Sequence, residues 1–404
     1  MTVLVPSDTR YIGGHALPSG WNITTLGEIF EIHQGKALSP SVRTANERFP
    51  FLRTANVLWG SIDITTVDSM GLTANERRQL ALRNGDLLVC EGGEIGRCAI
   101  WRAQLPECYY QNHLHRLRPL TPDTHPEFYA YWIQAAFTRL GIYEGVGNRT
   151  TIPNLSRARL AALPVPDVAG PEQQRIARVL STIQSSLEKT RAVLSSLALV
   201  RRSLIDDSLR RSAVGGGTVR LKSLVERPQY GLTASAAVRD GPRFLRITDI
   251  TEEGIDWSTV PSCATDPPAG TRYTLLDGDL VVARIGATTG KAWLVRQPPE
   301  AVFASYLIRI RPRPGVDARF LAAFFDSDDY RAQINASKGG RLKGGVNIEN
   351  LNSLLVPVLS ETPQAELVER IDRIDTCLVA TRRVREALAA VFDASLQALL
   401  GRNR

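Results

Sequence analysis

The sequence predicts an α+β protein of two tandem β-rich globular domains, each followed by a long helix, with the two helices pairing as an antiparallel coiled coil. Three observations lead to this prediction. The length of 404 residues suits two or three domains of roughly 100–200 residues each. The chain repeats itself once, and each copy ends in a long segment whose apolar residues recur at three- and four-residue steps.

The repeat is visible as blocks that keep one offset. Phe51-Leu52-Arg53 recurs as Phe244-Leu245-Arg246, which sets the offset at 193 (244 − 51 = 193). Four further pairs of blocks keep this offset: 62–63 and 255–256, 85–87 and 278–280, 113–119 and 306–312, and 154–166 and 347–359. Five blocks in order at one spacing exceed what chance produces, so the two halves are copies of one unit.

Each copy combines short strands with brief helices. Apolar runs rich in β-branched residues and bounded by Gly or Pro predict strands at 86–90, 280–285 and 307–311. Helical stretches are expected over Glu127–Leu140 and, in the second copy, over Ala318–Ile334.

The segments that end the two copies carry the pattern of a coiled coil. Their predicted core residues are Ile176, Leu180, Ile183, Leu187, Leu194, Leu197 and Leu204 in the first helix, and Ile371, Ile374, Leu378, Leu388, Phe392 and Leu399 in the second. Thr190 and Arg201 interrupt the first stripe, and Thr381 and Arg385 interrupt the second. Because a long isolated helix is marginal in water, we expect each stripe to be buried against the other.

Residues 212–219, which include three glycines, predict a flexible break between the first helix and the second copy. An antiparallel helix pair would place the globules at opposite ends, related by an approximate two-fold axis. That arrangement suits a target with two separated half-sites.

Composition narrows the class of protein. The 49 basic residues against 41 acidic ones give a net charge of +8, which favours a polyanionic partner without identifying it. No apolar run approaches the roughly 18 residues of a membrane span, and the first residues lack a secretory pattern. Five cysteines without a CxxC pair argue against a disulfide framework or a zinc knuckle. We therefore expect a soluble cytoplasmic protein.

Three fragments resemble chemical motifs, and each is better explained as ordinary structure. Residues 265–270 resemble an amino-methyltransferase signature, but Ala269 stands where an aromatic residue is needed. Residues 286–292 resemble a phosphate-binding loop with one residue too few and without its Ser or Thr. His113 and His115 have metal-ligand spacing, but their repeat counterparts are Tyr306 and Ile308, which favours a variable strand face. We predict no catalytic residues and no metal site.

Basic, Gly-rich turns are the candidate DNA contacts. Residues 145–151 and 337–345 occupy nearly corresponding positions in the two copies. Backbone amides in such turns approach phosphates closely, and Asn and Arg side chains can pair with base edges; solvated loop charges are the alternative interpretation. The candidate residues are Lys36, Arg97, Asn148, Arg149, Thr150, Lys291, Lys338, Arg341 and Lys343.

Taken together, these features resemble the specificity subunit of type I restriction–modification systems, over essentially the whole chain. The resemblance rests on the Pro-x-Pro-like segments 163–166 and 355–358, on Gly-Pro-Glu-Gln-Gln-Arg-Ile at 170–176, on the turn 84–88, and on the duplicated plan. The second helix departs from the pattern, since Gln364 and Glu366 stand where the first has Glu172 and Gln174.

The resemblance implies a division into target recognition domain 1 (1–169), a long spacer helix (170–212), target recognition domain 2 (213–360) and a second long helix (361–404). It implies a non-catalytic subunit of a prokaryotic cytoplasmic, nucleoid-associated complex. Each recognition domain would read half of a bipartite, asymmetric double-stranded DNA target, and the helices would dock two methyltransferase subunits. S-adenosylmethionine would bind those partners, which flip and methylate adenine at N6, and motor/nuclease subunits are further partners implied.

The residues by themselves leave two other interpretations open. One is a self-contained DNA-modifying enzyme with an unrecognised site. The other is a coiled-coil scaffold without sequence-specific DNA binding.

Overall fold

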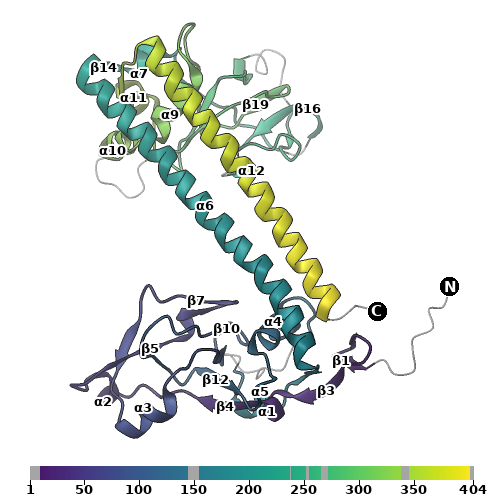
Figure 1. Ribbon diagram of the computed structural model, residues 1–404. Helices are drawn as coiled ribbons and strands as arrows, with labels where there is room; N and C mark the ends of the chain where they lie inside the picture. Colours follow the sequence, from purple (N-terminus) through teal and green to yellow (C-terminus); the bar gives the residue numbers. More distant parts are fainter. Residues whose placement is uncertain are drawn as a thin grey trace, which may run out of the picture. The chain divides into compact units, whose positions relative to one another are not determined.

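The computed structural model describes residues 10–143, 154–236, 238–251, 254–264, 272–337 and 345–400. It contains two compact units, which are described separately: unit 1 is Met1–Thr190 with Val384–Arg404, and unit 2 is Arg191–Arg383. Each unit combines a β-rich globule with part of both long helices, α6 (Gly170–Gly216) and α12 (Glu361–Leu400) (Figure 1). We call the globules head 1 and head 2. The predicted α+β class, with a long helix after each β-rich globule, is confirmed.

Head 1 is built around a four-stranded sheet of order β10-β9-β12-β4 and a three-stranded sheet of order β11-β5-β8. Its strands are β1 (Tyr11–Ile12), β2 (His15–Ala16), β3 (Asn22–Thr25), β4 (Phe30–Gln34), β5 (Phe49–Leu52), β6 (Val57–Leu58), β7 (Ser61–Ile62), β8 (Asp68–Met70), β9 (Leu87–Cys90), β10 (Cys98–Ile100), β11 (Tyr109–Tyr110), β12 (Leu114–Pro119) and β13 (Pro164–Asp167). Its helices are α1 (Leu26–Ile29), α2 (Pro40–Arg43), η1 (Thr54–Asn56), α3 (Ala74–Leu80), α4 (Pro126–Thr138) and α5 (Arg157–Ala161).

Head 2 repeats the four-stranded sheet, with the order β18-β17-β20-β15. Its strands are β14 (Thr218–Arg220), β15 (Gln229–Tyr230), β16 (Val238–Leu245), β17 (Leu280–Ala283), β18 (Ala292–Leu294), β19 (Ala301–Phe303), β20 (Leu307–Ile310) and β21 (Leu355–Pro357). Its helices are α7 (Leu221–Leu224), η2 (Ile247–Asp249), α9 (Ala318–Asp326), α10 (Asp328–Ser337) and α11 (Ile348–Ser353).

The structure confirms the duplication at the level of register and of a buried ion pair. Leu87 of β9 faces Leu117 of β12, and Leu280 of β17 faces Ile310 of β20, at the predicted offset of 193. The aspartate of the repeated Gly-Asp-Leu block accepts two hydrogen bonds from one arginine in each head: Asp86 from Arg118 at 2.8 and 2.6 Å, and Asp279 from Arg311 at 2.7 and 2.8 Å. The repeated motif therefore has a structural role: its aspartate forms an ion pair that links two neighbouring strands of the sheet.

One predicted helix is wrong in its extent. The predicted first-copy helix forms as α4, but the stretch expected as one helix over Ala318–Ile334 is two helices, α9 and α10. They are separated at Ser327, whose hydroxyl accepts a hydrogen bond from the Tyr330 backbone N–H at 3.1 Å. Ser327 thus caps the start of α10, and side-chain capping of this kind favours a new helix over continuation of the old one.

The two long helices pack against each other as an antiparallel pair. In unit 1, Ile176 and Leu180 of α6 belong to one core cluster with Phe392 and Leu396 of α12. In unit 2, the late α6 residues Ile205 and Leu209 share a core with the early α12 residues Leu367, Val368 and Ile371. The start of each helix therefore meets the end of the other.

The predicted coiled-coil residues vary in burial. Ile176, Leu180, Ile371 and Leu378 are buried. Phe392 is also buried. The side chain of Leu399 lies outside the described residues, and the other predicted residues are half-buried: Ile183, Leu187, Leu194, Leu197, Leu204, Ile374 and Leu388.

Helix α6 continues through residues 212–216, where the sequence suggested a flexible break. Ser212, Ala213 and Val214 are compatible with helix, and the helix ends only before Gly217, which has a φ of +75°. Glycine adopts this left-handed conformation without steric cost, so it terminates the helix. None of the helices in the described ranges is long and apolar enough to cross a membrane.

Candidate nucleic-acid interface

Six of the nine predicted DNA contacts lie outside the described residues: Asn148, Arg149, Thr150, Lys338, Arg341 and Lys343. The structure places the other three, Lys36, Arg97 and Lys291, on or beside the sheets of the heads.

Two of these three have partners within head 1. Lys36 forms an ion pair with Glu76, whose pKa the hydrogen bond from Lys36 lowers. Glu76 also accepts the Thr73 backbone N–H at 2.9 Å at the start of α3. Arg97 Nη2 donates to the Thr54 carbonyl at 2.6 Å, and Nη1 lies 3.4 Å from Glu94 Oε2. Lys36 and Arg97 therefore link neighbouring segments of head 1. The sequence pattern did not indicate these contacts.

Lys291 is the exposed member of the three. Its Nζ lies 5.5 Å from the centre of the Trp293 ring, an arrangement that weakly holds the ammonium group at the surface. It follows the turn 284–290 between β17 and β18, and residues 91–97 form the matching turn between β9 and β10. The phosphate-loop resemblance at 286–292 is therefore a strand-connecting turn, as the comparison of the two copies indicated.

One of the two histidines is a strand residue, whereas His113 lies in the turn that precedes β12. His115 lies in β12, is buried, and its Nε2 donates to the Leu155 carbonyl at 3.0 Å. Burial lowers the pKa of His115. No group of three or more His, Cys, Asp or Glu side chains in the part of the chain that the structure describes could hold a metal ion.

A pair of equivalent sites emerges where the central strands β9 and β17 end. The residue after β9 is Glu91, and the residue after β17 is Arg284. Glu91 donates its backbone N–H to the His113 carbonyl at 2.9 Å and accepts from the Leu155 N–H at 2.8 Å. Arg284 makes the same two bonds with Tyr306 and Val346, both at 2.9 Å. The side chains of Glu91 and Arg284 therefore start from equivalent backbone positions in the two heads.

The neighbouring strand completes each site. Gln34 ends β4 and is paired with His115, and Tyr230 ends β15 and is paired with Ile308. The glycine that follows each is close-packed: a Cβ on Gly35 would lie 2.3 Å from the Gln111 carbonyl oxygen, and one on Gly231 would lie 2.2 Å from that of Ala304. Glycine is required at both positions because no side chain fits there.

We define these groups as the strand-end sites: Gln34, Glu91 and His113 in head 1, and Tyr230, Arg284 and Tyr306 in head 2. Sequence reasoning missed them because their members differ in chemistry. In addition, Gln34 and Tyr230 are 196 residues apart (230 − 34 = 196), off the general offset of 193.

The side chains of the head 1 site are joined by hydrogen bonds. Gln34 Nε2 donates to Glu91 Oε2 at 3.0 Å and to the Asn112 carbonyl at 2.9 Å. His113 Nδ1 lies 3.7 Å from the same Glu91 oxygen. Glu91 is 6% exposed, whereas Gln34 and His113 are exposed at the surface above it.

The head 2 site is aromatic and cationic. The Arg284 guanidinium lies over the Tyr230 ring, 4.8 Å from its centre. The Tyr230 hydroxyl accepts the Ile348 backbone N–H at 3.4 Å. Tyr230 is 36% exposed and Tyr306 is 55% exposed, so the site faces solvent.

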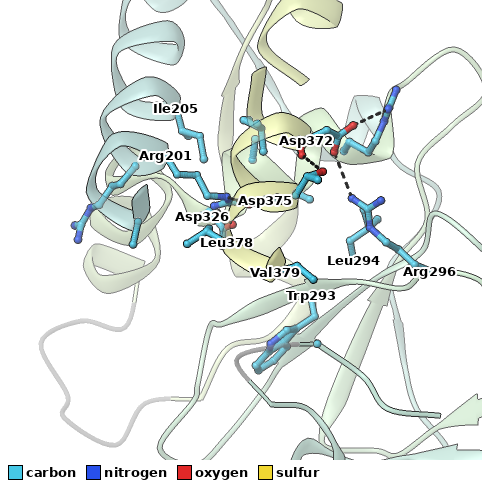
Figure 2. Close-up of a pocket in the computed structure, with 18 of the residues that line it drawn as sticks. Arg201, Ile205, Trp293, Leu294, Arg296, Asp326, Asp372, Asp375, Leu378 and Val379 are labelled. Carbon is cyan, nitrogen blue, oxygen red and sulfur yellow. Dashed lines mark hydrogen bonds and ion pairs between the residues drawn. The ribbon is translucent and has the colours of Figure 1, made fainter. Parts of the chain in front are cut away.

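Unit 2 also contains a cavity of about 990 Å³ lined by α6, α12 and head 2 (Figure 2). Arg201 lies at its wall, with Nε 2.6 Å from Asp375 and Nη1 2.9 Å from Asp326. Asp372 lies 3.7 Å from Arg296 and 3.1 Å from Arg319. These ion pairs link α6, α12 and head 2 at the wall of the cavity.

One relative and two solved structures match nearly the whole chain, and a family model matches its first part. Residues 18–194 match the family described as the type I restriction modification DNA specificity domain. In an alignment 422 positions long, the chain is 22% identical to the type I restriction enzyme EcoKI specificity subunit of Escherichia coli (strain K12). The alignment covers 93% of this chain and 86% of that protein.

Solved structures show the same fold. The S subunit of a type I restriction–modification system from M. genitalium matches with a TM-score of 0.61 and 14% identity, covering 99% of this chain and 98% of that one. A chain from a structural study of complex assembly and conformational transition in the type I R-M system gives a TM-score of 0.53 and 15% identity, with 96% and 99% covered.

Proposed function

The chain belongs to the specificity subunits of type I restriction–modification systems, and we propose that its two heads together recognise a bipartite, asymmetric DNA sequence. As a specificity subunit, it is a non-catalytic component of such a system. Target recognition domains 1 and 2 would span 1–169 and 213–360, joined and followed by the long helices at 170–212 and 361–404.

One observation carries this proposal. The heads share strand order, register and a buried Asp–Arg pair, yet at equivalent surface positions they present different side chains. One framework with two different surfaces suits the recognition of two different half-sites in one target.

We infer that the helices also dock two methyltransferase subunits. The half of α12 in unit 1 carries apolar residues at alternating three- and four-residue steps that head 1 and α6 leave exposed: Val384, Ala387, Val391, Ala394 and Ala398. Such a stripe is the pattern by which one helix packs on another, and a partner helix of the methyltransferase is the occupant we propose.

The chemistry would reside in those partners. They would bind S-adenosylmethionine and methylate adenine N6 of a flipped base, with motor/nuclease subunits as further partners in a prokaryotic cytoplasm. The predicted DNA contacts remain part of this proposal: Lys36, Arg97, Asn148, Arg149, Thr150, Lys291, Lys338, Arg341 and Lys343.

A DNA-binding assay on the purified complex with its methyltransferase subunit tests the proposal. We expect binding that falls steeply with salt and retains a component specific for one sequence. Binding without sequence preference would favour a scaffold, and methylation by this chain alone with S-adenosylmethionine would favour a self-contained enzyme.

A double variant tests whether the heads act independently. Replacing Arg341 and Lys343 with Ala should weaken recognition of one half-site while the other stays recognised. The matched control removes the same charge elsewhere on head 2, by Arg220→Ala with Lys222→Ala, and should leave both half-sites recognised. Equal loss on both half-sites in the Arg341/Lys343 variant would contradict independent heads.

A further inference from the structure

We propose that the strand-end sites recognise base edges in the major groove, and that they select different bases: head 1 adenine or cytosine, and head 2 guanine. This inference rests on the proposed function and assigns residues to it. The sites are Gln34, Glu91 and His113 in head 1, and Tyr230, Arg284 and Tyr306 in head 2.

Their position supports a role beside the predicted DNA-contacting loops. The backbone carbonyls of Glu91 and Arg284 accept from Leu155 and Val346, respectively. Each of these two donors follows by two residues a segment that carries predicted contacts, 144–153 or 338–344. The described residues that follow the two segments are therefore hydrogen-bonded to the strand-end sites.

The carboxylate of Glu91 indicates whether head 1 would contact bases or phosphates at this site. The buried carboxylate of Glu91 places a negative charge directly beneath Gln34 and His113. A phosphate at this position would be repelled, because a desolvated carboxylate has a stronger field than an exposed one. This charge disfavours contact with phosphates and favours contact through the neutral edges of the bases.

Hydrogen bonding then sets the preference of head 1. Both N–H groups of Gln34 are taken, one by Glu91 and one by the Asn112 carbonyl, so the amide presents its Oε1 acceptor to solvent. In the major groove the donors are the N6 amino group of adenine and the N4 amino group of cytosine, whereas guanine and thymine present acceptors. Head 1 is built to accept from adenine or cytosine.

Head 2 presents the opposite chemistry. Arg284 is oriented by its stacking on Tyr230, and the Tyr230 hydroxyl is in turn held by Ile348. A guanidinium fixed in this way offers two parallel donors, which match the O6 and N7 acceptors of guanine. Because Glu91 and Arg284 occupy equivalent backbone positions, the two half-sites should differ at the corresponding base.

The test compares variants of the full chain, each assembled with its methyltransferase subunit, on a DNA library in which every position of both half-sites is varied. Arg284→Lys keeps the positive charge but loses the two parallel N–H donors of the guanidinium. We expect discrimination for guanine to fall about tenfold or more at one position of one half-site, while the other half-site is unchanged. An unchanged sequence preference would overturn the assignment, because a phosphate contact tolerates lysine.

A second head 2 variant changes the preference rather than weakening it. Glutamine pairs with adenine through two hydrogen bonds, so Arg284→Gln should shift the preferred base at that position from guanine toward adenine. Uniform loss of methylation on all sequences in both Arg284 variants would contradict a base contact. Arg227→Lys, at an exposed arginine of the same head, is the matched control and should leave the preference unchanged.

In head 1, Glu91→Gln removes the carboxylate that fixes the Gln34 amide. The amide can then rotate to present its N–H groups, so the preference for adenine or cytosine should relax at one position of the other half-site. Glu94→Gln removes an exposed carboxylate from the same turn and should have no such effect. An identical preference in the Glu91 and Glu94 variants would overturn the head 1 assignment.

The proposed function and the strand-end assignment can be contradicted separately. If the wild-type complex shows no bipartite sequence, the proposed function is wrong. If the wild type shows one and the Arg284 and Glu91 variants all retain it unaltered, the proposed function stands and the strand-end assignment is wrong.

Discussion

Arg139 of head 1 and Asp393 of α12 form an ion pair in which Arg139 Nη2 donates to both carboxylate oxygens, at 2.9 and 3.0 Å. In unit 2 one of the ion pairs between head and helix has the opposite polarity, since Arg202 of α6 pairs with Asp328 of head 2. Positions 202 and 393 are 191 residues apart (393 − 202 = 191), the offset that also relates Thr190 to Thr381 in the two helices.

Reversing one of these pairs tests whether it holds head 1 on its helices. Arg139→Asp should lower the free energy of unfolding of unit 1 by about 1 kcal/mol, because a half-exposed pair contributes little and the new contact repels. Adding Asp393→Arg should restore most of the loss, as measured by urea denaturation. A double variant no more stable than Arg139→Asp alone would contradict the contact, and Arg202 with Asp328 offers the same experiment in unit 2.

The buried pairs should matter far more. Asp86 is 2% exposed, so Asp86→Asn leaves Arg118 without its counter-charge and should cost about 3–5 kcal/mol in the free energy of unfolding. Asp279→Asn should have a similar effect in head 2. The control is Glu172→Gln, which breaks an exposed pair with Arg175 on α6 and should cost under about 1 kcal/mol. Equal costs for the buried and exposed variants would contradict this ranking.

Head 1 should lose stability in mild acid through its histidines. Burial lowers the pKa of His33 and His115 below the unfolded value of about 6.5. The unfolded state therefore binds protons first, and the free energy of unfolding falls as the pH drops below about 6.5, by up to about 1.4 kcal/mol per pH unit for each histidine. All five histidines lie in the first 125 residues, so head 2 has no such contribution.

His115→Gln isolates this effect, because the glutamine amide can replace the N–H that His115 donates to Leu155. Urea denaturation of both proteins between pH 5.5 and 7.5 gives the measurement. The variant should show a shallower dependence on pH than the wild type. Parallel curves would show that His115 does not contribute.

The helix pair should set the gap between the half-sites. The boundary between units falls after Thr190 in α6 and after Arg383 in α12, so insertions at both points leave the contacts within each unit intact. Four residues in each helix add about 6 Å, close to two base pairs, and seven add about 10 Å, close to three. Seven residues also preserve the heptad seam. An unchanged gap in both insertion variants would contradict a spacer role.

Much of this architecture was predictable because it is periodic. The heptad stripe predicted that the two long helices pair, and the 193-residue offset predicted two copies of one unit, whose equivalent strands share their register in the structure. Local capping was harder to foresee: Ser327 divides a stretch of continuous helical periodicity, and α6 passes through residues 212–216 until Gly217 ends it.

The functional residues were the least predictable. A lysine in a Gly-flanked turn looks the same in sequence whether or not it pairs with a neighbouring carboxylate, as Lys36 does with Glu76. The strand-end sites were hidden for the opposite reason. The 193-residue offset aligns Glu91 with Arg284 (284 − 91 = 193), but a glutamate and an arginine share no motif that would mark a site. The matching backbone hydrogen bonds show that the two residues occupy equivalent positions.

The central claim, that two different heads recognise two half-sites, is tested most directly by mapping methylated adenines across the genome of cells that express this chain with its methyltransferase subunit. The account predicts one asymmetric sequence of two short specified blocks separated by a gap of fixed length and unspecified bases. A single contiguous sequence, or two identical half-sites, would contradict it.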